Sequence, residues 1–128
     1  MAASAQELAL RYLLELSADI RGALLMEGTG ELLATAGRLP GDELAETGRR
    51  IASEAAALRP AGDGPVEVDV LTGRGALFVL AEAGRVMVCT TNRSVNPGLI
   101  FYDMHAVLRD IDRAAAAEER RAMTGTGA

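Results

Sequence analysis

IRGALLMEGTGELLATA, residues 20–36, is the stretch of sequence that decides the fold. An apolar run reaches the turn sequence Glu27-Gly28-Thr29-Gly30, and a second apolar run leads away from it. Glycine adopts positive φ angles at little cost, and both flanking runs have the length and apolar bias of strands. The stretch therefore predicts a β-hairpin that opens the sheet of a small mixed domain.

A helix is predicted on each side of this hairpin. Ser4 followed by Glu7 has the spacing of a capping box, and apolar residues then recur at helical spacing to about residue 16. After the hairpin, residues 37–41 break the pattern, and Asp42 is placed to cap a helix that runs to about residue 58. Each helix is expected to bury an apolar face.

The second helix carries two different faces. Its core-facing stripe is predicted to consist of Leu44, Gly48, Ile51, Ala55 and Leu58. The adjoining positions are small, so another backbone can approach them closely, and two arginines lie near the middle of the helix. We interpret this second face as a candidate interaction surface, made of Ala45, Arg49, Ala52 and Ala56.

Three further strands follow a loop-like segment at residues 59–64. In residues 66–71 valines alternate with Glu67 and Asp69, which is the period-two pattern of a strand with one buried face. The next runs, ALFVLAE at residues 76–82 and RVMVCTTN at residues 85–92, are largely apolar on both faces and are expected to be buried. Short glycine-containing turns connect the three strands, which predicts an antiparallel meander.

A helix and a short tail are expected after the meander. Asn96 or Ser94 suits the capping position, Pro97 suits the first turn, and an apolar stripe continues to Ile111. Beyond about residue 117 the stripe is lost, and a frayed or disordered tail is predicted. We interpret residues 1–117 as a single domain and residues 118–128 as its tail.

The predicted elements occur in the order α-β-β-α-β-β-β-α. This order indicates an α+β fold with a five-stranded antiparallel sheet. Helices are needed on both faces, because the central strands are apolar on both. A chain of 128 residues is long enough to bury one sizeable core.

The composition disfavours several classes of function. Eighteen acidic residues outweigh 13 basic ones, and the net charge of −5 argues against a surface that neutralises nucleic-acid phosphates. The N-terminal sequence has no basic leader, and charged residues interrupt its apolar stretch. Neither a signal peptide nor direct membrane insertion is therefore expected. A single cysteine is compatible with a reducing cytoplasm, which is the expected location.

No catalytic, metal-binding or cofactor-binding motif is recognisable. Gly28 and Gly30 match the start of a dinucleotide fingerprint, but Leu33 occupies the third glycine position. Cys89 lies within an apolar strand, where a thiol is normally buried and inert. His105 is placed off the apolar stripe of the last helix, which favours a surface position, and one histidine alone does not build a histidine metal site. No cofactor and no enzyme activity are expected.

The strand at residues 66–71 is a second candidate interaction surface. If it lies at an edge of the sheet, its free backbone groups can pair with a second subunit. Glu67 and Asp69 would oppose such pairing where they approach their own copies, and Arg74 offers partial compensation. The candidate residues on this strand are Val66, Glu67, Val68, Asp69 and Val70.

Three segments, together with the order of elements, resemble the Roadblock family of dynein light-chain-like proteins. They are RGALLMEGTGELLATAG at residues 21–37, ALFVLAEAGRVMVCTTN at residues 76–92 and NPGLIFYDMHAVLRDID at residues 96–112. The resemblance covers nearly all of residues 8–114 and implies a profilin-like α/β sandwich. The sequence looks closest to bacterial members that accompany Ras-like GTPases, and in some of those groups a histidine-kinase-like sensor is also part of the system.

The resemblance implies a homodimer in which the second helices pack side by side and the third strands join two sheets into one. It also implies that a GTPase docks on this dimer. The expected function is therefore that of a non-enzymatic, homodimeric adaptor or regulator of a small Ras-like GTPase in a bacterial signalling system. On this interpretation, Ala52→Glu should dissociate the dimer and leave each monomer folded.

Other functions remain open from the sequence. A ligand-sensing module would need a cavity with convergent polar groups, which the aliphatic strands do not suggest. A purely structural scaffold would bind both nucleotide states of a GTPase equally well. An enzyme is the least favoured class, and an Arg finger from Arg49 or Arg50 is the one catalytic role considered for it.

Overall fold

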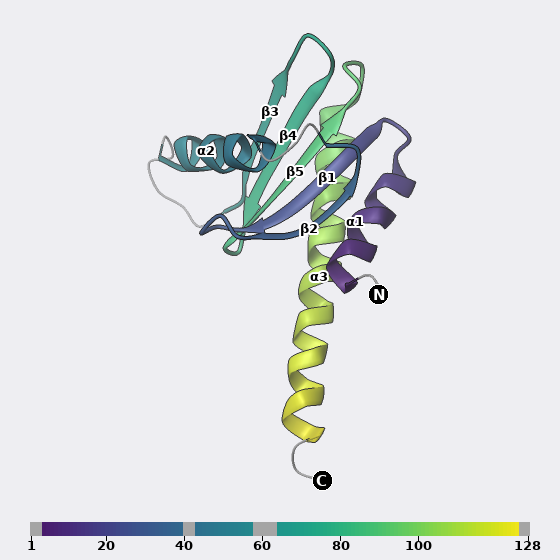
Figure 1. The fold of residues 1–128 in the computed structure, drawn as a ribbon, viewed down its shortest axis with the longest axis vertical. Coiled ribbons are helices and arrows are strands. Elements are labelled where there is room, and N and C mark those ends of the chain that lie inside the picture. Colours follow the sequence, from purple (N-terminus) through teal and green to yellow (C-terminus); the bar gives the residue numbers. More distant parts are fainter. Residues whose placement is uncertain (1–3, 40–42, 58–63, 126–128) are drawn as a thin grey trace.

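The computed structural model describes residues 4–39, 43–57 and 64–125. Within these residues, three helices and five strands follow in the predicted order (Figure 1). Their bounds are α1 Ala5–Leu16, β1 Ile20–Glu27, β2 Leu32–Gly37, α2 Glu43–Ala57, β3 Val66–Leu71, β4 Ala76–Glu82, β5 Arg85–Thr91 and α3 Pro97–Gly125.

The five strands form one antiparallel sheet in the spatial order β2-β1-β5-β4-β3. β1 and β2 are the hairpin predicted from residues 20–36, and β3, β4 and β5 are the predicted meander. The two units join where β1 pairs with β5, from Ile20 opposite Thr91 to Glu27 opposite Arg85. This pairing places β1, β5 and β4 inside the sheet and leaves β2 and β3 at its two edges.

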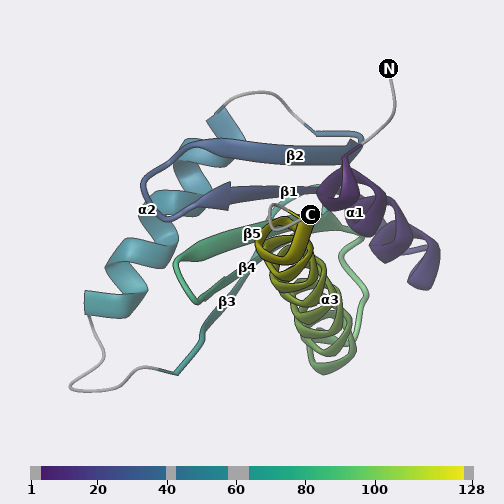
Figure 2. The same cartoon turned by 90° about the horizontal axis from the view of Figure 1, so that it is seen from below.

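Helices cover both faces of the sheet (Figure 2). α1 and α3 lie together on one face, where the larger core includes Leu13, Phe78 and Met104. α2 lies on the other face over a smaller core that includes Val79 and Val88. Successive residues of β4 and β5 therefore enter different cores, which explains why these strands read as continuous apolar runs. The predicted α+β fold with helices on both faces is confirmed.

Gly48 lets α2 approach the sheet closely. A Cβ atom at this position would lie 2.4 Å from Cγ2 of Val88 in β5, which is closer than two carbon atoms can approach. Glycine is a poor helix former, so its place in the middle of a helix needs a packing reason. The contact with Val88 supplies that reason and fixes which side of α2 faces the core.

The predicted starts of the first and last helices are confirmed. Ser4 Oγ accepts a hydrogen bond from the backbone N–H of Glu7 at 3.0 Å. Asn96 Oδ1 accepts hydrogen bonds from the N–H groups of Gly98 and Leu99 at 3.0 and 3.3 Å. These oxygens satisfy donors that have no partner within the helix. The predicted cap Asp42 of the second helix, its expected end at residue 58 and most of the loop after it lie outside the described residues.

α3 continues past the expected end of the domain. It runs to Gly125, through residues 118–125 where a tail was predicted, and its C-terminal part projects beyond the sheet and α1 (Figure 1). The side chains of residues 118–123 are exposed. The boundary near residue 117 therefore does not coincide with the end of the helix. No helix in the described part of the chain combines the length and the apolar character needed to cross a membrane.

Candidate interaction surfaces

β3 forms an open edge of the sheet. It pairs with β4 along its whole length, and its other side faces no strand among those described. Val66 and Val68 are half-buried, whereas Val70 and Leu71 are exposed to 38% and 64%. The edge position considered from the sequence is thus confirmed. An edge with free backbone groups and exposed apolar side chains is suited to pair with another strand.

Glu67 on this edge is held by a histidine of α3. His105 Nε2 lies 2.7 Å from a carboxylate oxygen of Glu67, and His105 Nδ1 lies 3.2 Å from one of Glu82. A carboxylate only accepts hydrogen bonds, so the imidazolium form, with two N–H donors, is the form that satisfies both contacts. The His105 side chain is 25% exposed and bridges two elements, so it is half-buried rather than on the open surface expected from the sequence.

The two flanks of α2 face different parts of the molecule. The guanidinium side chain of Arg49 lies beside Gly30 of the β1–β2 turn, where its Cδ would be 3.2 Å from a Cβ on that glycine. Because this hairpin and β3 belong to opposite edges of the sheet, the Arg49 flank faces away from β3. Helical geometry then places the other flank towards the β3 edge. That flank consists of Thr47, Ile51 and Glu54.

The α2 part of the interaction surface predicted from the sequence needs correction. Ala52 is 6% exposed and packs in the core under α2, so its assignment to an exposed face is wrong. Ala45 is half-buried against the same core, and Arg49 donates two hydrogen bonds to the carboxylate of Glu46. Ala56 is exposed, as expected. The error arises because alanine has little preference for either face, while the close packing of Gly48 on the sheet brings Ala45 and Ala52 towards the core.

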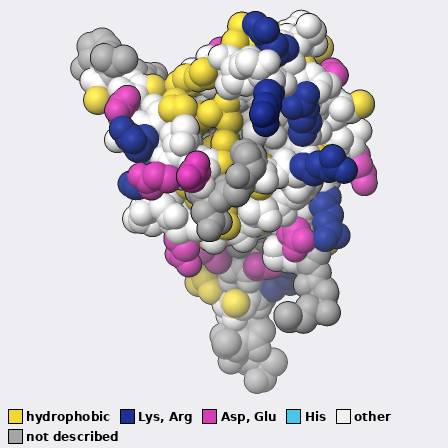
Figure 3. Space-filling model, turned by 45° about the horizontal axis from the view of Figure 1, so that its top comes forward, with side chains coloured by type: hydrophobic (Ala, Val, Ile, Leu, Met, Phe, Trp, Pro, Cys, Tyr) yellow, Lys and Arg dark blue, Asp and Glu magenta, His cyan; other side chains and the backbone are white. Residues whose placement is uncertain are grey.

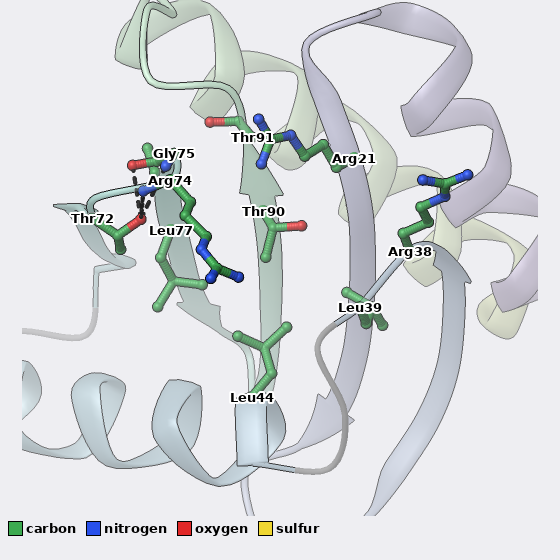
Figure 4. Close-up of a pocket in the computed structure, with 11 residues that line it drawn as sticks. Arg21, Arg38, Leu39, Leu44, Thr72, Arg74, Gly75, Leu77, Thr90 and Thr91 are labelled. Carbon is green, nitrogen blue, oxygen red and sulfur yellow. Dashed lines mark hydrogen bonds between the residues drawn. The ribbon is translucent and has the colours of Figure 1, made fainter.

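A hollow of about 470 Å³ lies between the start of α2, the β3–β4 turn and the ends of β4 and β5 (Figure 4). Leu39, Leu44 and Leu77 supply much of its apolar lining. Arg21 and Arg74 reach it from β1 and from the β3–β4 turn (Figure 4). On the surface, exposed hydrophobic side chains lie beside a gathering of basic ones (Figure 3).

The sequence does not indicate this hollow, because its aliphatic strands predict packing that leaves no cavity with convergent polar groups. The side chains in the middle of β4 and β5 are indeed buried, but the hollow opens at the ends of these strands. Its polar groups come from positions as far apart as Arg21, Arg74 and Thr90. Only the pairing of β1 with β5 and of β5 with β4 brings them together, and the sequence does not reveal this strand order.

Cys89 is not available as a nucleophile. Its side chain is buried between the sheet and the larger core, and burial raises the pKa of its thiol from 9.0 to about 12 because the thiolate would lose its hydration. The inert, buried thiol expected from the sequence is confirmed. Among the described residues, no group of three or more His, Cys, Asp or Glu side chains is placed to hold a metal ion.

Comparisons with known proteins identify the fold. No family model matches the sequence, and no curated protein does so either. Solved structures do match. The Roadblock/LC7 domain from Streptomyces avermitilis has a TM-score of 0.74 at 17% identity, over 86% of this chain and 97% of that chain. A structure of MglB with a tetrameric arrangement has a TM-score of 0.70 at 20% identity, over 91% of this chain and 95% of that chain.

A profilin matches as well. LokiProfilin2, solved in complex with rabbit actin, has a TM-score of 0.63 at 11% identity, over 86% of this chain and 97% of that chain. The fold is thus of the profilin-like α+β class. Within that class, the chain has the fold of a Roadblock/LC7 domain, and the resemblance noted in the sequence is confirmed at the level of the fold.

Proposed function

We propose that the protein is a homodimeric, non-enzymatic regulator of a small Ras-like GTPase. The observation that carries this proposal is the open β3 edge beside a half-exposed flank of α2, within a Roadblock/LC7 fold. The GTPase partner is implied by the Roadblock resemblance of the sequence. MglB, which shares the fold, has been solved in a tetrameric arrangement, and this supports assembly through the same kind of domain.

The proposed dimer joins two sheets through their β3 strands and places two α2 helices side by side. Val70, Leu71 and the half-buried Ile51 supply apolar surface for this contact. Glu67 and Asp69 were the objection to it, because like charges oppose pairing across strands. The contact of Glu67 with His105 provides a positive partner whenever the imidazole is protonated, and thereby reduces the repulsion at Glu67. The interface thus uses the predicted strand with the Ile51 flank of α2 in place of the Arg49 flank.

The dimer regulates its GTPase by binding one nucleotide state more tightly than the other. A ligand shifts a conformational equilibrium only by its difference in affinity for the two states. Regulation of this kind needs a shaped surface and no reactive side chain, in agreement with the inert thiol of Cys89. The proposal therefore predicts unequal affinities for the GDP-bound and GTP-bound partner.

Two variants test the dimer. Val70→Lys puts a charge on the β3 edge, whereas Leu32→Lys, the control, puts the same charge at a position that is 50% exposed on the opposite edge. Sedimentation at micromolar concentration should show a dimer for the original chain and for Leu32→Lys, and a monomer for Val70→Lys. A monomeric original chain of 13.4 kDa would contradict the proposed assembly.

A binding measurement tests the regulatory role. Ras-like GTPases from the same cell are purified, loaded with GDP or with a non-hydrolysable GTP analogue, and titrated with the protein. The expected result is one GTPase that binds in one nucleotide state at least tenfold more tightly than in the other, corresponding to about 1.4 kcal/mol. Equal affinities would leave a scaffold, and no binding to any of these GTPases would refute the proposed function.

A further inference from the structure

The hollow beside the β3–β4 turn has the size and lining of a ligand site. Its volume of about 470 Å³ falls within the range of small-molecule pockets. Leu44 and Leu77, both buried, and the half-buried Leu39 give it an apolar floor. Such pockets combine an apolar surface with a few polar groups that orient the ligand.

The polar groups at this hollow are positively charged. Arg21 and Arg74 come from two separate elements, and among the described residues no acidic side chain contributes to the lining. In Figure 4 the Arg74 side chain extends over the hollow between Leu77 and Thr90, and the Arg21 guanidinium lies beside Thr91. The whole chain carries a net charge of −5, so this local excess of positive charge runs against the composition.

Both guanidinium groups have unused donors. Arg21 Nε donates to Asn92 Oδ1 at 3.0 Å, which orients the side chain and leaves its terminal nitrogens available. The Arg74 guanidinium has no hydrogen bond or ion pair with any described residue. By contrast, Arg11 and Arg49 are each paired with a glutamate on their own helix. Guanidinium groups bind carboxylate and phosphate oxygens through paired N–H donors.

We propose that this hollow binds a small organic anion, with its phosphate or carboxylate between Arg21 and Arg74 and its apolar body against Leu44 and Leu77. The half-buried hydroxyl of Thr90, which has no hydrogen bond with a described residue, provides a further polar contact. Arg38 also lines the hollow, but its guanidinium points away from the centre (Figure 4) and is not part of the site. This site is independent of the proposed GTPase partner.

The test uses the full chain labelled with ¹⁵N and follows its backbone amides by NMR during titration with simple probes. Phenyl phosphate and benzoate carry both an anionic group and a ring, inorganic phosphate lacks the ring, and phenol lacks the charge. We expect saturable shifts of the Gly75, Leu77 and Thr91 amides with phenyl phosphate or benzoate at millimolar concentration. Phenol and inorganic phosphate should bind at least fivefold more weakly.

Variants of the two arginines complete the test. Arg74→Gln, in an exposed turn, and Arg21→Gln should each weaken binding of the favoured anion about tenfold and leave the response to phenol unchanged. Arg109→Gln is the matched control, because Arg109 is exposed on α3 at the other face of the sheet. The amide spectrum of each variant reports whether it is folded. Shifts spread over unrelated surfaces, phenol binding as tightly as the anions, or unchanged anion binding in Arg74→Gln would each overturn the proposal.

Discussion

Ala83 is held in a backbone conformation that its side chain disfavours. Its φ angle is 54°, and that of the next residue, Gly84, is 77°. Two consecutive positive φ angles are typical of the type I′ turn that joins the closely paired strands of a hairpin, here β4 and β5. Asparagine and glycine tolerate this conformation better than alanine does. The turn therefore stores strain that a substitution can relieve.

Ala83→Asn should raise the free energy of unfolding by about 0.5–1 kcal/mol, because asparagine adopts the left-handed conformation more readily. Gly84→Ala is the opposite case. A Cβ at Gly84 would meet no atom within 4 Å, so any loss of stability in this variant reflects backbone strain alone. Urea unfolding of both variants measures the two effects, and a destabilised Ala83→Asn would contradict the strain argument.

Cys89 makes the free energy of unfolding depend on pH in the alkaline range. The pKa of its thiol is about 12 in the folded chain and 9.0 in the unfolded chain, so the unfolded chain loses this proton first. The contribution of the protonated, buried thiol to the free energy of unfolding is complete below pH 9 and is lost as pH rises towards 12. Between pH 9 and 10 the free energy of unfolding should begin to fall, approaching about 1.4 kcal/mol per pH unit. Cys89→Ala should show a flatter profile, and equal slopes for the two proteins would contradict the prediction.

The sequence predicted the structural role of a single residue well where nearby residues in the chain determine that role. Ser4 and Asn96 cap helices because their partners lie two or three residues away. Cys89 is buried because the strand around it is apolar. His105 was misplaced because its partners, Glu67 and Glu82, are distant in the sequence and belong to other elements. A contact between residues that are distant in the sequence leaves no local sequence pattern from which it can be predicted.

At the level of elements, α2 shows how far periodicity can be used. Its existence and length follow from spacing, and Leu44 and Gly48 are on the buried face as predicted. Its rotation about its own axis was not fully determined, because alanines are compatible with either face. Ile51, assigned to the core, is half-buried, and Ala52, assigned to the interface, is buried. The strand edges were likewise identifiable as strands, while their spatial order was not.

Ala52→Glu is now expected to destabilise the single subunit. The new carboxylate would lie in the core between α2 and the sheet, at a cost of about 3 kcal/mol or more. Ala56→Glu, one turn further on an exposed position, should change the free energy of unfolding by less than about 0.5 kcal/mol. Urea unfolding at a fixed protein concentration compares the two variants. Equal stabilities would place Ala52 at the surface after all.

For the whole molecule, the helices on the two faces of the sheet cover hydrophobic cores of different size. The core under α1 and α3 is larger than the core under α2. α2 therefore depends on fewer apolar contacts and is the layer most open to influence from a second subunit. The proposed dimer edge and the arginine-lined hollow both lie next to α2 and its smaller core. The order of elements predicted this sandwich, whereas the unequal division of its core became visible only in the structure.

The extent of α3 gives a prediction about the domain boundary. A chain that ends at Ala117 loses only exposed residues among those described, so its free energy of unfolding should change by less than about 1 kcal/mol. A chain that ends at Leu108 also loses Ile111, which is 4% exposed in the larger core, and should be unfolded or severely destabilised. Circular dichroism with thermal unfolding distinguishes the two. A large loss of stability on removing residues 118–128 would show that they belong to the folded domain.

The projecting end of α3 has a consequence for how neighbours of this molecule can be detected. A helical segment of a few turns is marginal in water on its own, so its amide protons exchange readily with solvent deuterons. A molecule that binds along this segment would slow amide exchange there and leave the amide exchange rates in the sheet unchanged. Hydrogen–deuterium exchange of residues 118–125, measured by mass spectrometry, therefore reports whether another molecule binds along this segment.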